Sequence, residues 1–212
     1  MKTEILKIKG DWQEVVDDCR ATVKKPPLGK EPSQSFKKRI LISEHSPIRA
    51  MEAKFRWMDI PYWVAMHWKT HSWESRVDSQ RNDRQSRYDR KKAPQDAPVD
   101  FSGEVNIQHT IDTWRKRLCF QASRETREYA EDFKAALHKV QPEWSDVLVP
   151  NCVYRCGCPE QSCPLADTST TGRSYWEHLV ETTGARIFDD DIQKRYDLYN
   201  EVFWRGRKNG NE

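Results

Sequence analysis

Residues 65–84 read AMHWKTHSWESRVDSQRNDR and directly follow the apolar run from Ile60 to Val64. The stretch combines two histidines and several arginines and acids with short hydroxyl and amide side chains. Such groups need hydrogen-bond partners once they are buried, yet Trp63, Trp68 and Trp73 interleave with them, which argues against a purely solvated run. Aromatic walls with cationic and amide donors suit a flat, anionic ligand such as a nucleotide or flavin. A charged surface helix is the alternative.

The composition predicts a thin, aromatic core. The chain has 212 residues, which fits one large domain or two small ones. Charged residues make up 33% of it and the mean hydropathy is -0.95, while nine Trp, seven Tyr and seven Phe supply the apolar bulk. So modest a core predicts that oligomerisation buries further surface. A net charge of +3, from 36 basic and 33 acidic residues, is too balanced to predict a nucleic-acid partner.

The cellular compartment of a protein determines whether its cysteines form disulfides or stay reduced. No apolar run approaches the ~20 residues of a membrane span, and the first residues show no signal-peptide pattern. We therefore expect a cytoplasmic protein without a membrane partner, whose six cysteines are free thiols or metal ligands. Four thiols lie within twelve residues, close enough for one zinc ion although not in paired C-x2-C spacing: Cys152, Cys156, Cys158 and Cys163. Free thiols are the alternative.

Hydrophobic periodicity predicts an α+β order of elements. Alternation indicates strands at 4–9 and 50–59, and helices are expected at 12–24, capped by Asp11, and from about Ser33 or Ser35. A helix led by Pro61 is expected to carry His67 and His71 on one face. Residues 84–98 read as an exposed loop, residues 105–137 as the longest helix, and 175–180 and 190–204 as two short terminal helices.

Two motifs in this order resemble the flavin-dependent thymidylate synthases. Residues 61–68 look like the approach to that family's Arg-His-Arg motif, and Thr70-His71-Ser72 falls at the motif itself, followed at the matching intervals by Ser75 and Asp78. The family's second motif keeps its spacing in four residues: Asn106, Gln108, Asp112 and Arg117. The resemblance covers about residues 4–145 and is greatest to a divergent, phage-type branch, with its His-Ser-Pro-Ile-Arg turn at 45–49.

The chain also departs from the family pattern. Thr70 and Ser72 replace both motif arginines. The terminal Arg-Tyr falls on Asn82-Asp83, unless one deleted residue places Ser79-Gln80-Arg81 at the family's Ser-x-Arg. About twenty residues separate the two motifs, far fewer than usual in the family. The Leu-Pro-x-x-x-Tyr element that normally precedes the second motif is missing there, while a similar stretch follows it at 149–154.

The resemblance implies a single α+β domain at residues 1–148, in which a mixed or antiparallel sheet packs against long helices. Residues 149–212 then form a Cys-containing C-terminal extension. The implied activity is methylation of dUMP to dTMP by an FAD-dependent enzyme that uses NADPH and methylenetetrahydrofolate. The family works as a homotetramer with sites between subunits. A related pyrimidine nucleotide hydroxymethylase of a phage, or a flavin-less nucleotide-binding protein on the same scaffold, are the alternatives.

The resemblance also assigns roles to residues. Arg117 would be catalytic, stabilising charge that develops on the uracil carbonyl; an ordinary ion pair on a helix surface is the alternative. The flavin would be bound by His45, His71, Asp78, Asn106 and Asp112. The nucleotide would be bound by His67, Gln80, Arg81 and Arg84.

Overall fold

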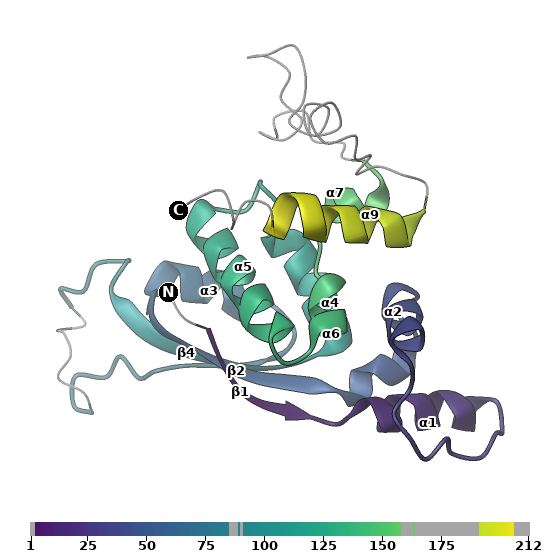
Figure 1. Cartoon of the computed structure of the whole chain (residues 1–212). Coiled ribbons are helices and arrows are strands. Elements are labelled where there is room, and N and C mark those ends of the chain that lie inside the picture. Colours follow the sequence, from purple (N-terminus) through teal and green to yellow (C-terminus); the bar gives the residue numbers. More distant parts are fainter. Residues whose placement is uncertain (1–2, 85–88, 90, 158–162, 164–190, 206–212) are drawn as a thin grey trace, which may run out of the picture.

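A computed structural model describes residues 3–84, 89, 91–157, 163 and 191–205 of the chain (Figure 1). Its centre is a four-stranded antiparallel sheet in the order β1-β2-β4-β3. The strands are β1 (Thr3–Lys9), β2 (Glu52–Pro61), β3 (Glu74–Val77) and β4 (Pro98–Asn106). The predicted α+β class and the strands near 4–9 and 50–59 are confirmed. None of the described helices combines the length and apolar character that a bilayer crossing requires.

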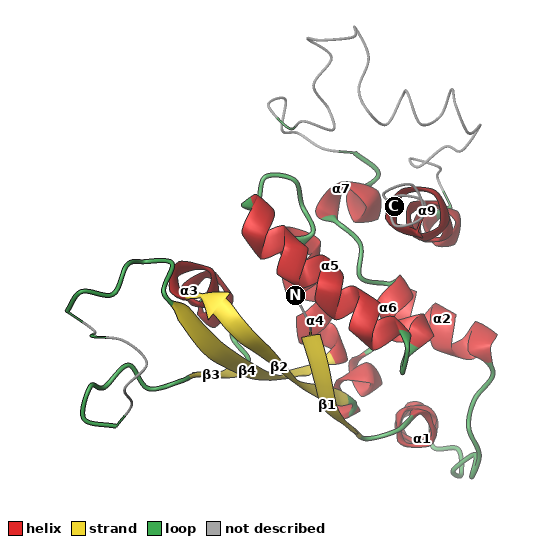
Figure 2. Ribbon diagram, turned by 60° about the vertical axis from the view of Figure 1, so that its left-hand side comes forward, coloured by secondary structure: helices red, strands yellow, loops and turns green. Residues whose placement is uncertain are grey.

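Helices cover one face of this sheet (Figure 2). The longer helices are α1 (Trp12–Thr22), α2 (Gln34–Ile42), α3 (Tyr62–Lys69), α4 (Ile107–Arg117) and α5 (Arg124–His138). Shorter elements are the 3-10 helix η1 (Ser46–Ala50), α6 (Pro142–Asp146), α7 (Asn151–Arg155), α9 (Ile192–Leu198) and the π-helix η2 (Tyr199–Arg205). Asp11 caps α1 and Ser33 caps α2 through hydrogen bonds from Glu14 N and Phe36 N, as these residue types predict.

The core between sheet and helices is aromatic, as the composition predicts. Burial alternates along the first half of β2, so Ala53, Phe55 and Trp57 point inward and are fully buried, as is Met51 just before the strand. Ring centroids lie 4.9 Å apart between Phe55 and Phe133, and 4.2 Å apart between Trp114 and Phe133. Trp68 of α3 joins the same cluster at 4.9 Å from Trp114. Large rings thus supply the contact area that scarce aliphatic side chains do not.

The single helix predicted for residues 105–137 is wrong. Val105 and Asn106 end β4, α4 stops at Arg117, and α5 begins only at Arg124. The reason is capping: Asn106 accepts a hydrogen bond from His109 N, and Ser123 accepts one from Thr126 N. Apolar periodicity continues across both breaks, because the strand and both helices face one core. Periodicity alone therefore hid the boundaries.

Two further expectations fail around α3. The helix ends at Lys69, with Thr70 as its C-cap, so His71 lies beyond it and does not share a helix face with His67. The Thr70 hydroxyl donates to His67 O at 2.8 Å within this last turn. The polar sequence that follows forms β3, and residues 98–106 form β4; neither strand was predicted. Both gain stability by pairing with a distant partner, which local pattern does not reveal.

The described part of the C-terminal segment packs on this core. Lys134 of α5 is fully buried and donates to Ser145 O at 2.7 Å, Leu148 O at 2.9 Å and Asn200 Oδ1 at 2.7 Å. Tyr196 and Trp204 are buried in the same cluster. Helix α9 and η2 confirm the helix predicted at 190–204, while 175–180 lies outside the described residues. The boundary at residue 148 stays a prediction.

Gly103 provides a test of the aromatic packing. A Cβ there would lie 2.5 Å from Trp73 Cζ3 and 2.6 Å from Phe55 Cε1. We expect Gly103→Ala to lower the free energy of unfolding by about 1–3 kcal/mol, because two packed rings must shift. Urea denaturation measures this. Ser102→Ala on the opposite face of β4 is the matched control, and an equal, small effect of both substitutions would contradict the packing.

Candidate functional site

Arg117 joins the ends of two helices. It is the last residue of α4, and its Nε donates to His71 Nε2 at 2.9 Å. Its Nη2 donates to His67 O at 2.8 Å, at the C-terminal end of α3. The structure thus brings together three residues that the resemblance selected, Arg117, His71 and His67. The His67 ring itself turns to α5, where Nδ1 lies 3.2 Å from Thr126 Oγ1.

This contact determines the protonation of His71. An arginine Nε–H only donates, so His71 Nε2 must accept, which leaves the proton of a neutral ring on Nδ1. Burial, followed by the charges of Arg117 and Lys116, lowers the pKa of His71 from 6.5 to about 4. Burial also lowers the pKa of Arg117. At neutral pH the pair is therefore a guanidinium beside a neutral imidazole that carries one N–H donor.

His71 lines a cavity of about 360 Å³ between α4, α7 and the segment after α3. Asp112 lines it as well, so two of the predicted flavin-binding residues share one cavity. The remaining charged or ionisable residues of the lining are His109, Arg115, Lys116, Tyr154 and Arg155. A concave site with several cationic donors and few acids suits an anionic ligand.

Asn106 lines a neighbouring cavity of about 420 Å³ that shares Ser72, Trp73 and His109 with the first. Its side-chain oxygen is already used to cap α4. On the same wall Glu104 binds Lys9 and Lys54, and these contacts lower the pKa of Glu104 to about 2. The two cavities together place His71, Asp112 and Asn106 along one side of α4.

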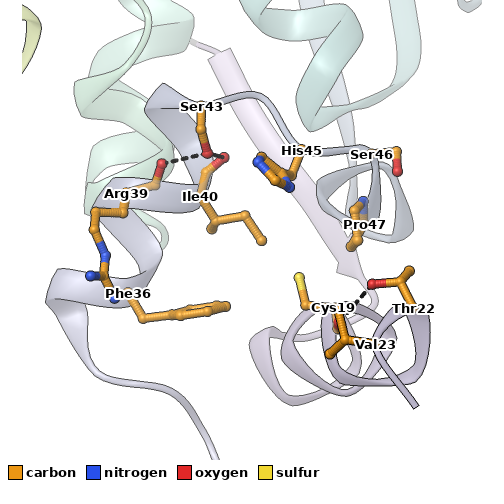
Figure 3. A pocket seen from close by; sticks show the side chains of 10 residues that line it. All are labelled: Cys19, Thr22, Val23, Phe36, Arg39, Ile40, Ser43, His45, Ser46 and Pro47. Carbon is orange, nitrogen blue, oxygen red and sulfur yellow. Dashed lines mark hydrogen bonds between the residues drawn. The ribbon is translucent and has the colours of Figure 1, made fainter. Parts of the chain in front are cut away.

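His45 lies elsewhere. It borders a third cavity, of about 700 Å³, between α1, α2 and η1. Figure 3 shows its ring near Pro47, with Cys19 and Phe36 on the opposite walls. The preceding residue, Glu44, ion-pairs with Arg115 and so ties this turn to α4. The predicted flavin contact of His45 stays a prediction.

The predicted ligand-binding residues within 78–84 follow β3, in a loop that Figure 1 shows extending past the end of the sheet. Asp78 N donates to Asp100 O at 3.0 Å, and Arg81 pairs with Asp83 at 2.6 Å. Arg81 and Arg84 are exposed, and Gln80 is half-buried. Among the described residues, the hydrogen bonds of the Arg117 side chain go to His71, His67 and Thr70 and not to this loop.

The predicted metal ligands are only partly described. Cys152 and Cys163 are buried and Cys156 is exposed, whereas Cys158 lies outside the described residues. The part of the chain that is described contains no group of three or more metal-ligating side chains. Zinc binding here stays a prediction.

Comparison with known proteins yields structural neighbours only. No family model and no curated protein matches the sequence. Two crystal structures of the flavin-dependent thymidylate synthase ThyX from Helicobacter pylori, complexed with FAD and dUMP, match with TM-scores of 0.58 and 0.59 at 11% identity. They cover 69% and 70% of this chain, and this chain covers 99% of each. The UMP/dUMP methylase PolB from Streptomyces cacaoi, bound to 5-Br dUMP, matches with a TM-score of 0.56 at 13% identity, over 69% of this chain and 93% of its own.

The chain has the fold of the flavin-dependent thymidylate synthases. The resemblance seen in the sequence is confirmed at the level of the fold, and the phage-type branch is not shown. The remainder of this chain lies outside these matches.

Sequence reasoning missed several residues of this cavity, among them Lys116, Arg155 and the buried Arg115. Arg115 is 7% exposed and lies four residues after Ile111 and three before Leu118, within the apolar stripe of α4. A lone arginine at such a position is the signal that would have revealed it, because a buried guanidinium requires partners. Here the partners are Glu44 and the hydroxyl of Tyr196.

The protonation of His71 predicts a pH dependence of stability. The unfolded chain binds a proton below pH 6.5, whereas folded His71 does so only near pH 4. The unfolded state thus binds more protons in this window, so the free energy of unfolding falls as pH drops from about 6.5 to about 4. The full shift corresponds to about 3 kcal/mol, reduced by solvent at this partly exposed ring.

We expect His71→Gln to flatten this slope in urea denaturation followed from pH 7 to pH 4. His45→Gln, which removes an exposed histidine at another cavity, is the control. A wild-type slope that survives in His71→Gln would contradict the assigned protonation.

Proposed function

We propose that this protein is an FAD-dependent enzyme that methylates dUMP to dTMP, with methylenetetrahydrofolate as carbon donor and NADPH as reductant. The observation that carries this proposal is the Arg117–His71 pair, which occupies the positions of two family motifs on a fold shared with ThyX. Arg117 holds its charge against His71, and His71 lines the 360 Å³ cavity. Both ThyX neighbours are solved with FAD and dUMP, which supports the choice of ligands.

The residues of the two cavities offer groups that parts of a flavin dinucleotide need. A flavin needs donors for its ring carbonyls, cations for its diphosphate and an apolar surface for its ring. The Nδ1–H of neutral His71 is such a donor, Lys116 and Arg155 are exposed cations of the lining, and Trp73 contributes an aromatic wall. When bound, the flavin supplies the hydride chemistry. His71, Asn106 and Asp112 would hold it through hydrogen bonds.

Arg117 would act on the nucleotide. Among the described residues its Nη1 has no hydrogen-bond partner, while Nε and Nη2 are held by His71 and His67 O. The guanidinium is thus oriented with one edge left for a ligand. An arginine remains charged throughout a reaction and stabilises negative charge on a uracil carbonyl. Partial burial strengthens that interaction.

A second subunit would complete the nucleotide-binding site. Gln80, Arg81 and Arg84, together with His67, are the proposed nucleotide-binding residues, and the loop after β3 is exposed. Since the described hydrogen bonds of Arg117 go to His71, His67 and Thr70 and not to this loop, a homotetramer with shared sites would account for both groups. The phosphate would displace Asp83 from Arg81. Light scattering tests the assembly: a monomer that binds flavin would contradict it.

One observation favours a second reaction. Thr70 and Ser72 flank His71 where the family motif has arginines, and Thr70 Oγ1 lies 3.5 Å from Arg117 Nη2. The absence of both motif arginines permits a related one-carbon reaction, hydroxymethyl transfer to a pyrimidine nucleotide. Visible flavin absorbance of the purified protein separates both enzymes from a flavin-less binding protein. Product analysis after incubation with dUMP or dCMP and methylenetetrahydrofolate then separates the two reactions.

Arg117→Lys is the sharpest test of the mechanism. Lysine keeps the positive charge but lacks the planar guanidinium. It therefore cannot donate to His71 and to a ligand at the same time in a fixed geometry. We expect single-turnover flavin reoxidation, at saturating nucleotide and folate, to slow by ~100-fold or more. Flavin and dUMP affinities should change much less, because the interaction strengthens in the transition state.

Arg124→Lys is the matched control, since Arg124 is an exposed helix arginine paired with Glu128. Reoxidation at the wild-type rate in Arg117→Lys would refute the catalytic role.

A further inference from the structure

The guanidinium of Arg115 is buried yet lines the His71 cavity. Its Nη2 donates to a Glu44 carboxylate oxygen and, at 3.4 Å, to the Tyr196 hydroxyl. The Tyr154 ring stacks beneath it, with 3.6 Å between Arg115 Cζ and the ring centroid. Among the described residues, Nε and Nη1 have no hydrogen-bond partner. The side chain is thus fixed in place with donors unused.

Unused donors on a buried cation point to an anionic ligand. A buried donor without a partner destabilises the fold, and a guanidinium matches phosphate oxygens well. Glu44 balances the charge of Arg115 itself, so further attraction comes from exposed Lys116 and Arg155 on the same lining. Asp112 is the one acid among the described lining residues; it is exposed and accepts from Gln108 Nε2 at 3.3 Å. The cavity therefore carries a net positive charge.

The C-terminal segment positions this cation. Tyr154 and Arg155 belong to α7, and Tyr196 belongs to α9. Buried Arg195 donates to Val153 O at 2.9 Å and to Tyr154 O at 3.0 Å, which fixes α7 against α9. All these residues follow residue 148, beyond the part of the chain that carries the family resemblance. The segment therefore builds one wall of the cavity.

We propose that Arg115, positioned by Tyr154 and Tyr196, anchors a phosphate group in this cavity together with Lys116 and Arg155. At about 360 Å³ the cavity lies at the small end of ligand sites, which span ~300–1,000 Å³, so it takes one phosphate-bearing moiety. The phosphate belongs either to the flavin dinucleotide or to the nucleotide. This choice rests on the proposed function, whereas the phosphate anchor itself does not.

Calorimetric titration of the full-length protein tests the anchor. Inorganic pyrophosphate is the first probe, followed by FAD against riboflavin and dUMP against deoxyuridine. Arg155→Gln should weaken binding of pyrophosphate and of one phosphate-bearing ligand by about tenfold, through loss of a charge-assisted contact. Riboflavin and deoxyuridine should be unaffected. Arg124→Gln on α5 is the control and should behave as wild type.

Tyr196→Phe tests the positioning role. It keeps the packed ring and removes only the hydroxyl beside Arg115, and we expect a several-fold loss for the same phosphate-bearing ligands alone. Equal losses for ligands with and without phosphate, no effect of either variant, or no binding of pyrophosphate by the wild type would overturn the anchor. Pyrophosphate binding that depends on Arg155, in a protein that binds neither FAD nor dUMP, would support the anchor and refute the proposed function.

Discussion

The hydrogen bond from His109 N to the side chain of Asn106 sets the geometry on which the rest of the structure depends. It ends β4 and starts α4 with no intervening loop, and Ile107 N still donates to Met51 O at 3.1 Å. The strand register therefore fixes the rotation of the helix. With that rotation Trp114 enters the core, Arg115 faces the cavity and Arg117 reaches His71. The position of one cap thus determines three different roles within the last turn of α4.

Two buried cations show how this aromatic-rich core tolerates charge. Lys134 is held by two backbone carbonyls and the Asn200 amide oxygen, with the Trp204 ring 4.6 Å from its Nζ. Arg115 is held by Glu44 and two tyrosines. In both cases part of the cage comes from the C-terminal segment. Because an uncompensated buried charge is costly, these contacts make that segment part of the folded unit, and a single core cluster extends into it.

The residues of the candidate site differ in how firmly protein contacts orient their side chains. Arg117 and His71 are oriented by each other before any ligand arrives, which limits the reorganisation that binding requires. The loop after β3 is instead exposed, with Arg81 paired to a neighbouring acid. In the proposed site, α4 would supply the rigid part and the loop after β3 the adaptable part. The missing flanking arginines at 70 and 72 leave a smaller, more hydroxyl-rich surface around His71.

The sequence alone determined those features that depend on residues close together in the chain. Three predictions that depend on neighbours along the chain are confirmed: alternation in β2, the caps Asp11 and Ser33, and the aromatic core. The spacing from Asn106 to Arg117 also selected Arg117, which the structure places beside His71. Only the tertiary structure decided where apolar periodicity breaks, since β4, α4 and α5 face one core and share its pattern. It also decided that His71 leaves α3, that 74–77 pairs with β4, and that Arg115 is caged by Glu44, Tyr154 and Tyr196. Those outcomes depend on partners 24 or more residues away, as Val77 is from Phe101, and no local window contains the free energy of that pairing.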